Sequence, residues 1–169
     1  LCTKIIKFNS MDINRLIDRT YTKKAPSNDY MKYWRVIRYF FKIKYNISTG
    51  DLEMMLFLYS ERYFSKEKFN EFDELLSWDT ARFDNLLKNG WIGVFRKNRG
   101  KHKTLYELSY KTRKMLSSLY KKLNGEEIPE SLTSNPLLYK NVSYSDKIYR
   151  NMILEMNKFI RQQRHLSQE

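Results

Sequence analysis

The chain has 169 residues, of which 41% are hydrophobic and 15% aromatic, enough to build a folded core. No apolar run approaches the roughly 18 to 20 residues that cross a bilayer, so the sequence argues against a membrane-spanning protein. The single cysteine, Cys2, excludes an internal disulfide and a cysteine-based zinc cluster. The two histidines, His102 and His165, lack neighbouring ligands, so we expect no metal and no cofactor.

The net charge is +13, from 32 Lys and Arg against 19 Asp and Glu. This balance favours a polyanionic partner, through attraction to phosphates and release of counterions. Alanine occurs only at Ala25 and Ala81, while Lys, Asn, Ile and Tyr abound, as in proteins of AT-rich genomes, where lysine accumulates without any function. The placement of the charges therefore matters more than their number. Residues 1–10 lack the apolar centre of a secretory signal, which leads us to expect a cytoplasmic protein.

Residues 1–47 are predicted to form an N-terminal extension and a first dimerisation helix. From Tyr30 to Tyr45, apolar residues recur every three or four positions, which predicts an amphipathic helix. Its other face carries five basic residues, and no acid occurs between Tyr30 and Gly50. Two interpretations of this basic face stay open, a solvated surface or one that meets DNA phosphates or an acidic partner.

Three shorter helices are predicted next. The first runs from about Asp51 to Ser60, with Ser48 or Thr49 as its cap, and the second from about Lys66 to Leu76. Ser77 can cap the third, from about Trp78 to Asn89, and Gly90 stands where a helix end favours a left-handed residue. The second and third helices, joined by a tight turn, predict a helix-turn-helix.

A basic hairpin is predicted after these helices. Residues 91–96 and 104–108 have the composition of strands, and the polar loop 97–103 between them contains Gly100. The segment 93–103 carries a charge of +5 and no acid. Ser109 can cap a further helix from Tyr110 to Leu123. The order of elements predicts a mainly α fold, with a winged helix-turn-helix core over residues 48–123 and the hairpin as its wing.

Residues 124–143, which contain Pro129 and Pro136, are predicted to be a linker, and residues 144–169 a C-terminal dimerisation helix and tail. An apolar stripe runs along nearly the whole helix from about Tyr144 to Arg164. A helix gains most of its stability by packing such a stripe, so this one must dock on the N-terminal helix, on a second copy of the chain, or on both.

Several stretches of this region resemble a known family: the capped helix Asp51–Ser60, the segment Asn85–Ile92, the wing Arg96–Lys103 and the run Tyr106–Leu116. Through them, residues from about Lys44 to Leu123 resemble the winged-helix core of the MarR family of bacterial transcription regulators. Arg113 stands near a position where that family commonly has glycine. The resemblance implies a homodimer formed by the terminal helices, with double-stranded DNA as the partner. The candidate dimerisation residues are Tyr33, Trp34, Ile37, Phe40, Phe41, Ile148, Met152, Met156 and Phe159.

Two groups of residues are candidates for DNA contact. Those of the helix-turn-helix are Ser77, Trp78, Ala81, Arg82 and Asn85, and those of the wing are Arg96, Lys97, Arg99, Lys101, His102 and Lys103. Five fixed charges on a slim loop suit contact with the DNA backbone or the minor groove. By contrast, residues 66–90 hold six acids and four bases, a net charge of −2 that phosphates repel. Whether the second helix of this helix-turn-helix, from about Trp78 to Asn89, contacts DNA bases or binds protein therefore stays open.

The expected function is DNA-binding transcription regulation, with the transcription machinery as a possible protein partner. Catalysis is not expected, because no Ser/His/Asp set, glycine-rich phosphate loop or paired-carboxylate motif stands out. Two alternatives remain. The winged helix could serve as a protein-interaction module within a nucleoprotein or phage-type assembly, or the plentiful Tyr and Phe could stack on RNA bases.

Overall fold

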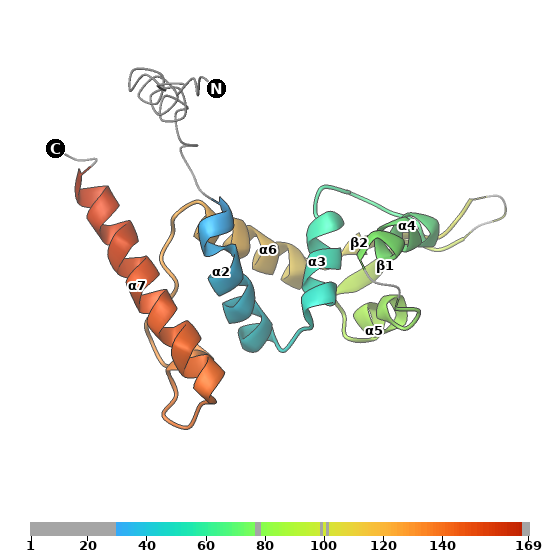
Figure 1. Ribbon diagram of the computed structural model, residues 1–169. Coiled ribbons are helices and arrows are strands. Elements are labelled where there is room, and N and C mark those ends of the chain that lie inside the picture. The colour runs from blue at the N-terminus through green and yellow to red at the C-terminus, as the bar shows by residue number, and fades with distance from the viewer. Residues whose placement is uncertain (1–29, 77–78, 99, 101, 167–169) are drawn as a thin grey trace, which may run out of the picture.

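The computed structural model describes residues 30–76, 79–98, 100 and 102–166. Over these residues the fold is mainly helical, with one small antiparallel hairpin (Figure 1). In chain order the elements are α2 (Tyr30–Tyr45), α3 (Thr49–Phe57), α4 (Lys66–Leu76), α5 (Arg82–Lys88), β1 (Ile92–Arg96), β2 (Leu105–Leu108), α6 (Tyr110–Leu123), the short 3-10 helix η1 (Pro136–Leu138) and α7 (Tyr144–Leu166). The predicted class and order are therefore confirmed, and the order is compatible with a winged helix. None of the described helices is both long and apolar enough to cross a bilayer.

Side-chain caps set the starts of α3 and α6. The Ser48 hydroxyl accepts a hydrogen bond from the Asp51 N–H at 3.0 Å, and the Ser109 hydroxyl accepts one from the Thr112 N–H at 3.3 Å. Each bond satisfies an amide that has no partner within its helix. At the end of α5, Gly90 adopts a φ of +70°, the left-handed conformation that the sequence predicts there.

Helix α5 is shorter than predicted, because it begins at Arg82 rather than near Trp78. The Asp73 carboxylate accepts a hydrogen bond from the Asp79 N–H, and the Asp79 carboxylate accepts one from the Ala81 N–H, each at 3.0 Å. These bonds hold residues 79–81 as a turn instead of a helical start. The predicted cap, Ser77, lies outside the described residues.

The C-terminal helix α7 packs against α2 of the same chain (Figure 1). The rings of Tyr39 and Tyr149 stack at 3.7 Å, and the Tyr39 hydroxyl donates a hydrogen bond to the Asp146 carboxylate at 2.8 Å. Burial and this bond raise the pKa of Tyr39 to about 12. Tyr39 therefore stays neutral at physiological pH and keeps its role as a donor.

This packing corrects part of the predicted dimer interface. Ile37, Phe40, Phe41 and Met156 are at most 3% exposed, so they belong to the core of one chain and are unavailable to a partner. Their assignment as dimer contacts was wrong because α2 and α7 cover each other within the chain. The remaining five candidates are partly or more widely exposed: Tyr33, Trp34, Ile148, Met152 and Phe159.

The predicted linker, residues 124–143, is fastened to α7. The buried Asn157 side chain accepts a hydrogen bond from the Ile128 N–H at 3.0 Å and donates to the Ile128 carbonyl at 2.8 Å. It also donates to Glu130 at 2.7 Å. Further along α7, Arg161 pairs with Glu127 at 2.7 Å. One side chain thus satisfies both backbone groups of a buried residue and fixes the segment on the helix.

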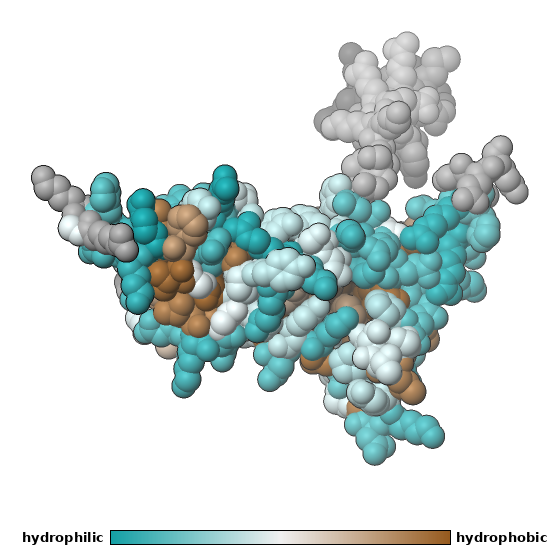
Figure 2. Space-filling view, turned by 180° about the vertical axis from the view of Figure 1, so that it is seen from behind, coloured by the Kyte–Doolittle hydropathy of each residue, from teal (hydrophilic) through white to brown (hydrophobic). Residues whose placement is uncertain are grey.

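Strands β1 and β2 pair antiparallel, with a register shift between Val94 and Arg96. Phe64, ahead of α4, adds one further bridge to Tyr106 through reciprocal backbone hydrogen bonds of 3.0 and 2.8 Å. The hairpin lies at the opposite end of the molecule from α7 (Figure 1). In the view from behind, where this end is on the left, hydrophilic side chains surround an apolar patch (Figure 2).

The Asn157 contacts generate a prediction about stability. Asn157→Ala leaves the buried N–H and carbonyl of Ile128 without their partner, at a cost of about 1 to 3 kcal/mol each. We expect the free energy of unfolding, measured by urea denaturation, to fall by about 2 to 5 kcal/mol. The matched control, Asn151→Ala at an exposed position of α7, should change it by less than about 0.5 kcal/mol. Equal effects of the two substitutions would contradict this role.

Candidate nucleic-acid interface

The hairpin loop, residues 97–104, and its flanking strand present cations to solvent. Arg96, Lys97, His102 and Lys103 are all exposed, whereas Arg99 and Lys101 lie outside the described residues. The Asn98 N–H donates a hydrogen bond to the Thr104 hydroxyl at 3.2 Å, which braces the loop across its two sides. The structure thus brings the four describable wing candidates together on one projection.

One of these cations already has a partner. Lys103 donates to the Glu67 carboxylate of α4 at 3.0 Å, and both side chains are largely exposed. Hydrogen bonds from Ser65 and from Lys103 lower the pKa of Glu67 to about 2. The carboxylate therefore stays ionised at physiological pH, and a DNA phosphate must compete with it for Lys103. Arg96 and Lys97 form no ion pair within the described part of the chain.

An aromatic and basic cluster at the base of the hairpin was missed by the sequence reasoning. Phe95 of β1 is 48% exposed and stacks on Tyr63 at 3.9 Å. The guanidinium of Arg62 lies over the Tyr63 ring at 5.3 Å. Arg113 joins them by donating hydrogen bonds of 3.1 Å to the carbonyls of Arg62 and Leu108. The sequence carries no signal for this cluster, because the exposure of Phe95 and its stacking on Tyr63 depend on the tertiary fold.

Arg82 does not lie where a DNA-reading side chain would. It is 5% exposed, and its guanidinium is paired with the carboxylate of Asp73 in α4. Asp51, in the first turn of α3, lies 3.6 Å from it, and Asp79 lies 4.0 Å away. The prediction that Arg82 contacts DNA is therefore wrong, because these carboxylates compensate its charge inside the protein.

Gly50 makes room for this ion cluster. A Cβ atom at position 50 would stand 2.8 Å from a terminal nitrogen of Arg82, closer than Cβ atoms stand to other groups in folded proteins. The close approach brings the first turn of α3 against the guanidinium. Glycine at this position thus serves packing rather than backbone flexibility.

The outward face of α5 is electrically balanced. Asp84, Asn85 and Lys88 are exposed on it, and Ala81 is exposed just ahead of it. Asp84 and Lys88 offset each other in charge, which leaves Asn85 as an exposed group able to hydrogen-bond a base. Ser77 and Trp78, the other candidates of the helix-turn-helix, lie outside the described residues.

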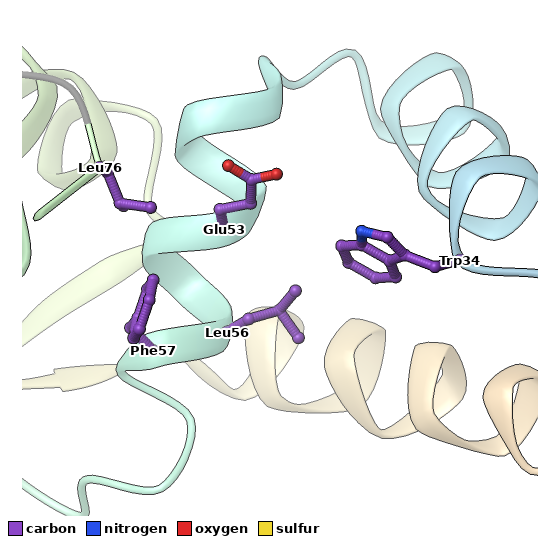
Figure 3. Close-up of a pocket in the computed structure, with 5 residues that line it drawn as sticks. All are labelled: Trp34, Glu53, Leu56, Phe57 and Leu76. Atoms are coloured by element: carbon purple, nitrogen blue, oxygen red, sulfur yellow. The ribbon is translucent and has the colours of Figure 1, made fainter. Parts of the chain in front are cut away.

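An apolar pocket of about 450 Å³ opens where α2, α3 and α4 meet. Trp34 and Leu76 approach the outward face of α3 from opposite sides, where Leu56 and Phe57 line the pocket (Figure 3). The polar side chain lining it is Glu53, which accepts a hydrogen bond from Arg38 at 3.1 Å. A mostly apolar surface of this kind can bind hydrocarbon or aromatic groups, and its single carboxylate suits neither phosphate nor a metal.

Comparisons with protein-family models, curated proteins and solved structures found no match. Among the described residues, no group of three or more His, Cys, Asp or Glu side chains could hold a metal ion. The function must therefore be argued from the chain itself.

The ion pairs of Arg82 should make a large contribution to the stability of the fold. Asp73→Ala leaves a buried guanidinium without its main partner, which should lower the free energy of unfolding by about 3 to 5 kcal/mol in thermal or urea denaturation. Asp84→Ala, which removes an exposed carboxylate of α5, is the control and should change it by about 0.5 kcal/mol or less. If Asp73→Ala were as stable as the unaltered chain, the cluster would not hold the helices together.

Proposed function

We propose that this chain is a winged-helix protein that binds duplex DNA through its basic hairpin and acts as a transcription regulator. The observation that carries the proposal is the group of exposed cations, Arg96, Lys97 and Lys103, on a narrow hairpin at one end of the molecule. A slim basic projection can reach phosphates on both sides of a DNA groove. The bridge from Phe64 to Tyr106 adds support, because it anchors the hairpin to the helices.

In this proposal the hairpin supplies most of the affinity and α5 supplies little. The α5 face carries no net charge at Asp84 and Lys88, and Arg82 is engaged inside the protein. Asn85 is the exposed side chain of α5 with the amide geometry that pairs with adenine. Sequence preference would then come from Asn85 and from the shape of the groove.

A second candidate function is protein docking within a nucleoprotein assembly. It is favoured by Leu75, which is 75% exposed at the end of α4, beside the apolar pocket lined by Leu76. A contiguous apolar surface left in water, such as Leu75 together with this pocket, commonly marks a protein contact. In that case the hairpin would contribute only weak, sequence-independent DNA binding.

We also propose a homodimer, formed by side chains of α7 that keep part of their surface exposed, although Phe159 among them also contacts Tyr33 of α2. Ile148 and Phe159 are 44% and 37% exposed, and Met152 between them is partly exposed. Positions 148, 152 and 159 fall on one side of the helix, next to the stripe that packs on α2. The surface formed by positions 148, 152 and 159, which we call the α7 seam, is narrow. We therefore expect a weaker dimer than one in which all the predicted dimerisation residues of α2 and α7 took part.

The DNA proposal is tested by removing two unpaired cations. Arg96→Ala combined with Lys97→Ala should weaken duplex binding across sequences in fluorescence anisotropy. It should also reduce the slope of log Kobs against log salt by about 1.8, since each phosphate contact contributes about 0.9. Lys147→Ala with Lys158→Ala, two exposed lysines of α7, matches the charge loss and should leave the slope unchanged. Unaltered binding by the hairpin variant at low salt would refute the proposal.

The dimer is tested by one charge in the α7 seam. Ile148→Glu should weaken self-association at least tenfold in sedimentation experiments, because each protomer then places a charge in an apolar contact. Leu154→Glu is the matched control, since Leu154 is 41% exposed on another side of α7. Met156 is unsuitable for this test, because a charge at a buried position would unfold the chain. A wild-type chain that stays monomeric at micromolar concentration, with and without DNA, rules the dimer out.

A further inference from the structure

A second basic surface lies on α6 and the end of α2. Lys111, Lys114 and Lys121 of α6 are exposed, as is Lys44 of α2. On α6 the three lysines fall at helical spacings that share one side, with the small Ser118 between them. Neither 30–50 nor 109–125 contains a single Asp or Glu. We call Lys44, Lys111, Lys114 and Lys121 the lysine face.

Aromatic rings connect the two helices of the lysine face. Lys111 lies 3.8 Å from the centre of the Trp91 ring and donates a hydrogen bond to the Asn89 carbonyl at 3.2 Å. Trp91 meets Tyr45 edge-on at 6.4 Å, and Lys44 lies over the Tyr45 ring at 5.7 Å. Lys44 and Lys111 thus flank the same pair of rings, so the lysines of α2 and α6 belong to one surface.

The charge of this surface is compensated only in part, by the Glu126 carboxylate, whose pKa is lowered by a hydrogen bond from Lys122 and by the charges of Lys122 and Lys121. No carboxylate lies within 4.0 Å of the four ammonium groups in the part of the chain that the structure describes. Burial, and the charge of the neighbouring Lys122, lower the pKa of Lys44. Lys122 itself pairs with Glu126 at 2.8 Å. An anion placed at the lysine face would relieve this mutual repulsion.

Helix α6 runs from the base of the strands toward α2 and α7, whereas the hairpin loop projects from the strands at the other end of the molecule (Figure 1). Arg113, which bonds to Leu108 at the base of the hairpin, lies on the other flank of α6, because successive residues turn by about 100°. The distance from Lys111 to Lys121 along the helix is about 15 Å, over which duplex DNA carries about nine phosphate charges. Ser118 lies between the lysines, and exposed lysines suit a phosphate backbone better than the core of a protein interface, where lysine is depleted.

We propose that the lysine face binds the phosphate backbone of a second duplex, so that one chain bridges two DNA segments. The inference rests on the proposed function, since the hairpin must hold the first segment. It adds a distinct site on α6 and the end of α2. The bridging follows from the separation between these helices and the projecting loop of the hairpin (Figure 1).

The test is a bridging assay with the full chain. A biotinylated duplex on beads captures the protein, and recovery of a second, fluorescent duplex reports bridging. Lys114→Gln with Lys121→Gln should reduce that recovery at least tenfold while the first duplex remains bound. Lys114→Arg with Lys121→Arg, which keeps the charge, should restore it, and Lys147→Gln with Lys158→Gln controls for net charge. All variants carry Ile148→Glu, so that two hairpins of a dimer cannot account for bridging.

The outcomes separate the two proposals. If the chain with the unaltered lysine face binds one duplex but recovers no second one, the lysine face is not a DNA site and the hairpin proposal stands. The same holds if the Gln variant bridges as well as its charge-matched control. A surface for an acidic protein would give the same absence of bridging. If Arg96→Ala with Lys97→Ala leaves binding of a single duplex intact while the Gln variant abolishes it, the hairpin proposal fails and the lysine face is the main DNA site.

Discussion

The guanidinium of Arg82 is the point at which α3, α4 and the start of α5 meet, and the arrangement of the helices around it depends on its charge. A buried guanidinium is tolerated only when carboxylates surround it, and here Asp73, Asp51 and Asp79 come from three successive parts of the chain. Asp73 also accepts the Asp79 N–H, so one carboxylate fixes both the turn and the arginine. Loss of the Asp73 carboxylate would therefore disrupt both the turn and the ion pair with Arg82.

Because Arg82 is buried, α5 and the hairpin expose different amounts of positive charge to solvent. Helix α5 buries Arg82 in the interior and shows solvent a face without net charge at Asp84 and Lys88. In the hairpin, the cations that the structure describes, Arg96, Lys97 and Lys103, are exposed. Helices α2 and α6 each carry five basic residues and no acid. Along the chain, the acidic segment 66–90 thus lies between the basic segments 30–50 and 93–103, and the net charge of +13 is unevenly distributed.

The local features of the fold could be predicted from the sequence. The apolar repeats give the limits of α2, α4 and α6, and Ser48 and Ser109 cap helices as their positions predict. These features depend on neighbours in sequence, which periodicity and capping rules describe well.

The features that failed depend on tertiary partners. A stripe such as that of α7 requires a cover, and its pattern is the same whether the cover is α2 of the same chain or a second copy. Arg82 looks like a surface cation until Asp51, thirty-one positions earlier, is brought beside it. The stacking of Phe95 on Tyr63 likewise joins a strand to a segment ahead of α4, so no local sequence pattern predicts it.

The fit of Gly50 against Arg82 has a consequence for how such a sequence can diverge. A larger residue at position 50 would collide with the guanidinium of Arg82. A shorter or neutral residue at position 82 would leave the carboxylates of Asp51 and Asp73 without their cation. Each single step passes through a destabilised intermediate, whereas joint replacement by an apolar set restores packing without charge. In distant homologues these four positions should therefore change as a group, and their correlated variation would trace the junction of the helices through evolution.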